Sequence, residues 1–281
     1  MEQHILSREE IKRYSRWLRT EERSTATLER YLRDIRRFYG WLGSHAVTRE
    51  LVAEWKEQLL SRRKSTATVN VALSALNSLF RFLDWSDCRT RFLKIQRSAF
   101  CDPSRELSRA EYSRLVSTAW QRGDEQLALI LETICATGIR VSELRYITVE
   151  AARQGTAEIR LKGKFRVILL PGKLCKKLLK YAGKAKNTSG EIFLTRIGRL
   201  LNRRQIWARM KALCAWAGVA PEKVFPHNLR HLFATAFYRA TRDIAKLADI
   251  LGHSSVETTR IYLKTSGAEH RRELEQLGLI L

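Results

Sequence analysis

The sequence predicts a mainly helical protein with two domains, of which the second also contains a small β-sheet. Three observations support this fold class. Apolar residues recur with the period of an α-helix from Ser7 to Trp85. Over residues 86–105 that period is lost, and Asp, Ser, Pro and Arg accumulate. Helical patterns then return and are interrupted once, by two short segments of alternating, β-branched character.

The first domain, residues 1–90, is predicted to contain four helices. The segment "STATLERYLRDIRRFYGWLG" is amphipathic and begins at an N-cap candidate, Ser24 or Thr25. The segment "STATVNVALSALNSLFRFLDW" repeats the pattern, and shorter helices are expected near residues 8–20 and 48–62. The residues that we expect to face the core are Leu28, Tyr31, Leu32, Ile35, Phe38, Tyr39 and Leu42 on the first segment, and Val69, Leu73, Leu76, Leu79, Phe80 and Leu83 on the second.

A basic linker, residues 91–105, leads to the second domain, residues 106–281. That domain opens with the helix "ELSRAEYSRLVSTA" and continues with the apolar helix "EQLALILETICATG", which ends at Gly138. The two strands are "AEIRLKG" and "FRVILLPG". From Lys173 the pattern returns to helices, and the C-terminal tail "SGAEHRRELEQLGLIL" is expected to form the last one.

The chain is strongly basic, with 52 Lys and Arg residues against 29 Asp and Glu residues and a net charge of +23. Such an excess repels itself unless a polyanion neutralises it, so nucleic acid is the expected partner. The alternative is a protein whose arginine-rich surface and linker are merely solvated. Membrane binding is not expected, because no stretch combines a basic face with a large apolar face.

The cysteines and the N-terminus indicate a reducing, cytoplasmic compartment. The five cysteines lie far apart and form no CxxC pair, so neither a disulfide framework nor a zinc ribbon is expected. Residues 1–10 carry charges where a signal peptide would be apolar, and no apolar run approaches the length of a membrane span.

Four separated segments place cations or a histidine at a turn: "ATGIRVSELR", "RLKGK", "HNLRH" and "LGHSSVETTRIY". Together they resemble the signature of the tyrosine recombinases, the phage integrase family, and in particular its two-domain, Xer-like site-specific recombinases. That signature has an Arg in a "TGxRxxEL" turn, a Lys in a β-hairpin, "HxxR", "LGH", and a Tyr nine residues after the last His. The matching positions are Arg140 and Glu143, Lys162, His227 and Arg230, His253, and Tyr262.

The resemblance extends from about residue 20 to about residue 265 and covers both domains. It implies that the first is a core-binding, SAM-like domain, and that both close as a C-shaped clamp on double-stranded DNA carrying a specific recombination site. It implies no cofactor. The tail, with Leu274, Leu277 and Leu279 to bury, would dock on a neighbouring protomer of a homotetramer or fold back on its own domain.

The chemistry of strand cleavage explains these residue types. In-line attack on a phosphodiester needs a nucleophile, cations at the non-bridging oxygens and an acid at the leaving 5′ oxygen. Arg140 and Arg230 offer bidentate donors that stay charged. Tyr262 is the expected nucleophile, and because phenols ordinarily titrate at about pH 10, it would need cations and a proton acceptor. The expected product is a 3′-phosphotyrosyl link that is rejoined without ATP or metal.

The histidines and the lysine take the remaining roles. His227 is the candidate proton acceptor and His253 the phosphate hydrogen-bond donor. Lys162 is the candidate acid, with Lys164 as the alternative because it stands two positions away on the same face of a strand. His227 and His231 have the spacing of zinc ligands, but the arginine between them would repel a cation, so no metal is expected.

Two other functions remain open from the sequence. A type IB topoisomerase-like enzyme would use the same residues to relax any supercoiled DNA. A non-catalytic helical DNA-binding protein would keep the charge and the linker without needing a tyrosine at a fixed distance from a histidine.

Overall fold

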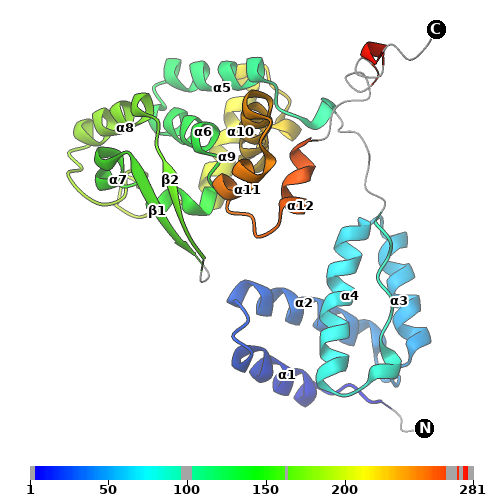
Figure 1. Ribbon diagram of the computed structural model, residues 1–281. Coiled ribbons are helices and arrows are strands. Elements are labelled where there is room, and N and C mark those ends of the chain that lie inside the picture. Colours follow the sequence, from blue (N-terminus) through cyan, green and yellow to red (C-terminus); the bar gives the residue numbers. More distant parts are fainter. Residues whose placement is uncertain (1–3, 96–102, 162–163, 264–270, 272–274, 278–281) are drawn as a thin grey trace. The chain divides into compact units, whose positions relative to one another are not determined.

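The computed structural model describes residues 4–95, 103–161, 164–263, 271 and 275–277. The chain divides into two compact units, Met1–Arg97 and Ser98–Leu281, each with its own core (Figure 1). The mainly helical fold with one small sheet is therefore confirmed. Within the described ranges, no helix combines the length and the apolar character needed to cross a bilayer.

The first unit is a bundle of four helices (Figure 1). These are α1 (Arg8–Thr20), α2 (Thr25–Leu42), α3 (Arg49–Ser61) and α4 (Thr66–Phe82). Each begins after a Ser or Thr whose hydroxyl accepts a hydrogen bond from the backbone N–H three residues on. For α2 this N-cap is Ser24, the first of the two predicted candidates.

The predicted apolar stripes of α2 and α4 form the core of this unit. Ile35 and Phe38 are fully buried against Leu76 and Phe80, and Leu28, Tyr31, Tyr39 and Leu83 cover them as half-buried residues. The core extends past the last helix, because the side chains of Asn70 and Asn77 each exchange two hydrogen bonds with the backbone of Leu93 and Thr90, respectively. The beginning of the predicted linker thus runs along α4.

The second unit packs its helices around α6, most of whose residues are buried. The helices are α5 (Arg109–Gln121), α6 (Glu125–Thr137), α7 (Val149–Gln154), α8 (Gly172–Lys184), α9 (Arg203–Ala217), α10 (Pro226–Thr241), α11 (Ile244–Leu251) and α12 (Val256–Thr259). Short 3₁₀ turns of this unit include η3 (Val141–Tyr146) and η5 (Arg260–Leu263), and the first unit has a similar turn, η1 (Ser86–Cys88). Helices α5, α8 and α10 contact α6 directly (Figure 1).

The predicted sheet is an antiparallel hairpin of β1 (Thr156–Leu161) and β2 (Lys164–Leu169), with Ile159 opposite Arg166. Its inner face buries Ile159 and Ile168 in the core of the unit. Because alternate residues of a strand point to opposite faces, Arg166 shares the inner face of β2 with Ile168. An inward arginine is the feature that connects this hairpin to the site described next.

Candidate active site

Three turns and one helix bring the predicted residues of the second unit together. Arg140 follows the end of α6 and precedes η3, and His227 and Arg230 lie one helical turn apart on α10. His253 follows α11, and Tyr262 lies in η5. Lys162 and the side chain of Lys164 lie outside the described residues, so the position of the acid stays a prediction.

Arg230 is at the centre of this cluster and is only 2% exposed. Its guanidinium donates to the carbonyl oxygen of Gly138, to that of Leu251 at 2.7 Å and to Nε2 of His253 at 3.1 Å. Burial, followed by the charge of Arg140, lowers the pKa of Arg230 to about 10. Arg230 therefore stays charged at neutral pH while it joins the ends of α6 and α11.

Glu143 holds two arginines from different segments. Its side chain is 2% exposed, and its Oε1 accepts a hydrogen bond from Nη1 of Arg140 at 3.0 Å. Its Oε2 accepts from the backbone N–H of Arg140 at 2.7 Å and from Nη2 of Arg166 at 2.5 Å. A buried carboxylate is stable only when its charge is paired, and here two guanidiniums share it.

His253 is held between Arg230 and Thr259. Because the arginine can only donate, Nε2 of His253 is the acceptor, and Nδ1 carries the hydrogen that it donates to Oγ1 of Thr259 at 2.8 Å. Burial, followed by the charges of Arg230, Arg140 and Arg166, lowers the pKa of His253 to about 4. The imidazole is therefore neutral at physiological pH.

His227 faces the same group of arginines. The residue is exposed to solvent, and partial desolvation by the surrounding protein is the largest cause that lowers the pKa of His227. The charges of Arg230, Arg140 and Arg203 act in the same direction. A neutral imidazole is the form that can accept a proton.

Tyr262 is 3% exposed and packs on Leu247 and Leu251. Its ring is stacked on that of His253, with centroids 6.0 Å apart and planes 13° apart. The ring of His231 meets it edge-on at 5.1 Å, and that of His227 lies at 6.3 Å. The five described residues of the predicted catalytic set thus lie in one cluster.

Two members of the cluster were not predicted from the sequence. Arg166 was not singled out; its only signal was a charged residue at an inward position of an otherwise apolar strand face. His231 was considered only for its zinc-like spacing from His227, yet its ring contacts Tyr262, and its nitrogens lie 3.4 Å from the hydroxyl of Thr235 and 3.8 Å from the carboxylate of Glu106.

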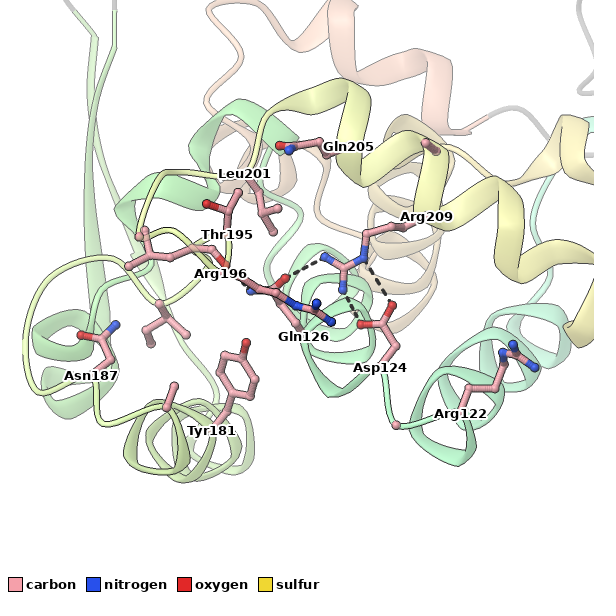
Figure 2. A pocket seen from close by; sticks show the side chains of 16 residues that line it. Arg122, Asp124, Gln126, Tyr181, Asn187, Thr195, Arg196, Leu201, Gln205 and Arg209 are labelled. Carbon is pink, nitrogen blue, oxygen red and sulfur yellow. Dashed lines mark hydrogen bonds and ion pairs between the residues drawn. The ribbon is translucent and has the colours of Figure 1, made fainter.

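A cavity of about 1010 Å³ lies at the other end of α6 (Figure 2). Its lining includes Asp124, the N-cap of α6, whereas Arg140 follows the C-terminal end of that helix. The prominent cation of the cavity, Arg209, is already paired with Asp124 and donates to Oε1 of Gln126 at 2.7 Å. The cavity contains none of the predicted catalytic residues and is separate from the cluster.

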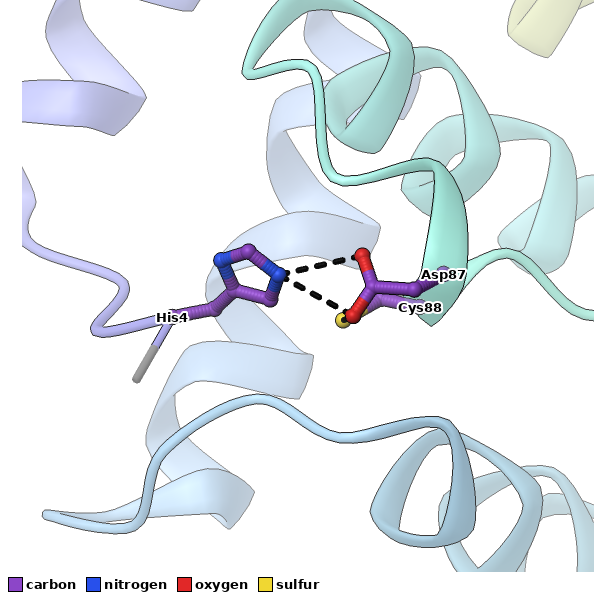
Figure 3. A group of neighbouring side chains, drawn as sticks. All are labelled: His4, Asp87 and Cys88. Atoms are coloured by element: carbon purple, nitrogen blue, oxygen red, sulfur yellow. Dashed lines mark hydrogen bonds and ion pairs between the residues drawn. The ribbon is translucent and has the colours of Figure 1, made fainter. Parts of the chain in front are cut away.

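Among the described residues, one group has three potential metal ligands: His4, Asp87 and Cys88 in the first unit (Figure 3). The imidazole Nε2 already lies 3.0 Å from Oδ1 of Asp87, and the thiol donates to the carbonyl oxygen of Val47 at 3.4 Å. Burial raises the pKa of the Cys88 thiol to about 11, which opposes the thiolate that a metal would need. These contacts fasten the N-terminal segment to η1.

The chain is similar to known recombinases along nearly its whole length. Residues 105–269 match the family model described as "Phage integrase family", and residues 11–87 match "Phage integrase, N-terminal SAM-like domain". The tyrosine recombinase XerA of Thermococcus kodakarensis is 30% identical, with 97% of this chain and 96% of that protein covered. The tyrosine recombinase XerD of Yersinia pestis is also 30% identical, with coverage of 92% and 93%.

Solved structures share the fold. A lambda integrase dimer bound to a COC′ core site has a TM-score of 0.76 at 18% identity, with 94% of this chain and 96% of that chain covered. The Tn1549 transposon integrase in complex with transposon right end DNA has a TM-score of 0.71 at 19% identity, with coverage of 96% and 99%. The matched family models and the similarity to XerA show that this chain belongs to the phage integrase family, the tyrosine recombinases.

Proposed function

We propose that this enzyme carries out site-specific recombination by cutting and rejoining DNA strands through a 3′-phosphotyrosyl link at Tyr262. The observation that carries the proposal is the convergence of Arg140, His227, Arg230 and His253, from three separate segments of the second unit, on the neighbourhood of that tyrosine. A phenol beside two guanidiniums and two neutral imidazoles is equipped for in-line attack on a phosphodiester.

The scissile phosphate would bind between Arg140 and Arg230. The side chain of Arg140 is 42% exposed, and its Nε and Nη2 groups have no hydrogen-bond partner among the described residues. Those donors are available to a non-bridging oxygen, whereas buried Arg230 supplies a charge fixed by its carbonyl partners. Donors that are fixed before charge develops stabilise the transition state without reorganisation.

The two histidines would act in their neutral forms. His227 accepts the phenol proton as Tyr262 attacks. His253 donates to the phosphate from Nε2, which requires the other tautomer and the loss of the hydrogen bond that Nε2 accepts from Arg230. The hydroxyl of Thr259 allows this tautomer because it can donate to Nδ1 as well as accept from it.

The leaving 5′ oxygen would be protonated by Lys162, with Lys164 as the alternative. The phosphotyrosyl bond conserves the energy of the phosphodiester. Attack on it by a 5′ hydroxyl can therefore reverse the reaction. Rejoining to a different strand gives recombination, and no step uses ATP or a metal.

The DNA complex would use the whole chain. We propose that residues 1–90 and 106–281 bind opposite faces of a duplex, connected by residues 91–105, and that four protomers assemble on paired sites. The net charge of +23 supports a polyanionic ligand. Leu277, an apolar residue of the tail, is exposed in the single chain, which supports docking on a neighbouring protomer.

The decisive experiment isolates the covalent intermediate. The protein is expressed in its host, trapped adducts are purified under denaturing conditions, and the attached DNA ends are sequenced to give the target site. A duplex with that site and a nick beside the scissile phosphate then prevents religation. We expect a protein–DNA adduct on a denaturing gel with the wild type, and none with Tyr262→Phe, while DNA affinity stays within about twofold.

Two outcomes would contradict the proposal. An adduct that survives Tyr262→Phe would assign the nucleophile to another residue. Relaxation of any supercoiled plasmid, without dependence on the sequenced site, would favour the topoisomerase-like alternative.

A further inference from the structure

Arg166 joins three segments of the active site although it comes from the hairpin. Its side chain is 12% exposed. Nη2 donates to Oε2 of Glu143 in η3 at 2.5 Å, and Nη1 donates to the carbonyl oxygen of Ile250 in α11 at 2.8 Å. Each of these partners lies within three residues of a predicted catalytic residue, Arg140 or His253.

The stem of Arg166 also lies directly against the turn that carries His253. Gly252 has a positive φ of 63°, and a Cβ built there would lie 2.7 Å from Cδ and 2.8 Å from Nη1 of Arg166. The turn therefore needs glycine for two reasons: its backbone is left-handed, and the arginine occupies the space of a side chain.

Arg166 also determines which carboxylate oxygen of Glu143 is available to the side chain of Arg140. Glu143 has two carboxylate oxygens, and Arg166 occupies Oε2, so the side chain of Arg140 is bound at Oε1 through Nη1 alone. Without Arg166, Glu143 would be a buried carboxylate with one guanidinium partner, and a bidentate pair is the strongest geometry for that partner. Arg140 would then be drawn toward Glu143 and away from a phosphate.

We infer that Arg166 is a positioning residue for strand cleavage, which holds Glu143 so that Arg140 keeps donors for the scissile phosphate. This inference rests on the proposed function. Arg166 does not itself touch the phosphate; it acts through Glu143 on Arg140, and through Ile250 and Gly252 on the turn before His253.

The test uses the full-length protein and the nicked substrate with two scissile linkages, the normal phosphodiester and a methylphosphonate. The methylphosphonate lacks the negative charge of one non-bridging oxygen, so it needs less stabilisation from Arg140. For Arg166→Gln we expect single-turnover cleavage of the phosphodiester to fall about 10²-fold, the scale of losing one transition-state donor. On the methylphosphonate, the loss of cleavage rate of Arg166→Gln relative to the wild type should be at least tenfold smaller. The same reduction is expected for Arg140→Ala.

Three further variants make the test specific. Arg160→Gln removes an exposed arginine of the same hairpin, paired with Glu158, and should cleave within about twofold of the wild type. Arg166→Lys keeps the charge but cannot reach both acceptors, so it should fall between the wild type and Arg166→Gln. Gly252→Ala displaces Arg166 without removing any hydrogen-bonding group, and should show the same relief on the methylphosphonate even if Arg166→Gln does not fold.

The outcomes separate this inference from the proposed function. If the wild type forms no adduct at Tyr262, the proposed function fails. If the wild type forms the adduct but Arg166→Gln and Gly252→Ala cleave the phosphodiester as fast as the wild type, the positioning role is wrong. It is also wrong if these variants lose the same factor in rate on both linkages, and Arg166 is then only a structural ion pair.

Discussion

At the level of single residues, the site keeps three arginines close together by binding them to backbone carbonyl oxygens or to one shared carboxylate. Arg230 is bound by carbonyl oxygens, whereas Arg140 and Arg166 share Glu143. The two proposed phosphate ligands therefore differ, because Arg230 is buried and also connects elements of the fold, while Arg140 is half exposed.

Substitution of the two arginines should consequently have different effects on cleavage and on stability. Arg140→Ala should reduce cleavage about 10²-fold with only a moderate loss of stability, because Glu143 keeps Arg166 and the backbone N–H at position 140 as partners. Arg230→Ala should reduce cleavage at least as much and also destabilise the second unit, since each buried carbonyl left without a donor costs about 1–3 kcal/mol. Single-turnover cleavage and calorimetric melting of both variants check this, and equal melting temperatures would contradict it.

The lowered pKa of His253 makes stability depend on pH. The pKa is about 4 in the folded chain against an ordinary value of 6.5, so between these values the unfolded state binds more protons. Stability contributed by the neutral imidazole is present above pH 6.5 and is lost as the pH falls toward 4. Melting temperatures of wild type and His253→Gln between pH 7 and pH 4.5 should converge on acidification; parallel curves would exclude this.

The motif residues could be predicted from the sequence because their spacing is fixed along the chain. Arg166 could not, because its role depends on the register of β2 and on the contact with Gly252, which only the folded chain creates. The burial of Tyr262 and its contact with His231 were missed for the same reason: they depend on how η5 packs on α10.

At the level of elements, the helices follow the local signals of the sequence. The Ser and Thr caps of the first unit and the end of α6 at Gly138 were predictable, because capping involves neighbours in sequence. The hairpin was predicted as well, but the face that points to the active site was not. The alternation of side chains along a strand defines two faces and does not show which of them is the inner one.

Gly138 connects this local signal to the site. It has a φ of 65°, and a Cβ there would collide with the ring of Phe233 on α10. Gly138→Ala should destabilise the second unit by about 1–2 kcal/mol from the left-handed backbone, and further from overpacking. Gly40→Ala, in open space within α2, should stabilise the first unit by about 0.5–1 kcal/mol. Calorimetry of the full chain measures the unfolding transitions of both units. A higher melting temperature of the second unit in Gly138→Ala would refute the argument.

At the level of the whole molecule, the loss of helical period over residues 86–105 suggested two domains, and the chain has two compact units with separate cores. Their arrangement on DNA is not determined by either core, because the contacts that would fix it involve the duplex. The proposed clamp and tetramer therefore depend on the ligand as much as on the chain.

DNA affinity should consequently decrease steeply with ionic strength. If the enzyme neutralises about 6–10 phosphates, its affinity should fall by about 10³–10⁵ between 50 and 200 mM salt, because bound counterions are released on association. Fluorescence anisotropy with a duplex of the target site measures the slope of log Kd against log salt. A slope near zero would mean that the excess of arginine and lysine serves solubility rather than binding.

The enclosure of Tyr262 has a consequence for how the enzyme searches a genome. A recombinase meets an enormous number of irrelevant phosphodiesters for each correct one, and cutting any of them would leave a lesion. Because Tyr262 is 3% exposed and its ring packs against those of His231 and His253, we expect it to attack arbitrary duplex rarely. Selection of the correct site would then begin before any base is read, because a buried phenol reaches a phosphorus atom only when DNA binding exposes it.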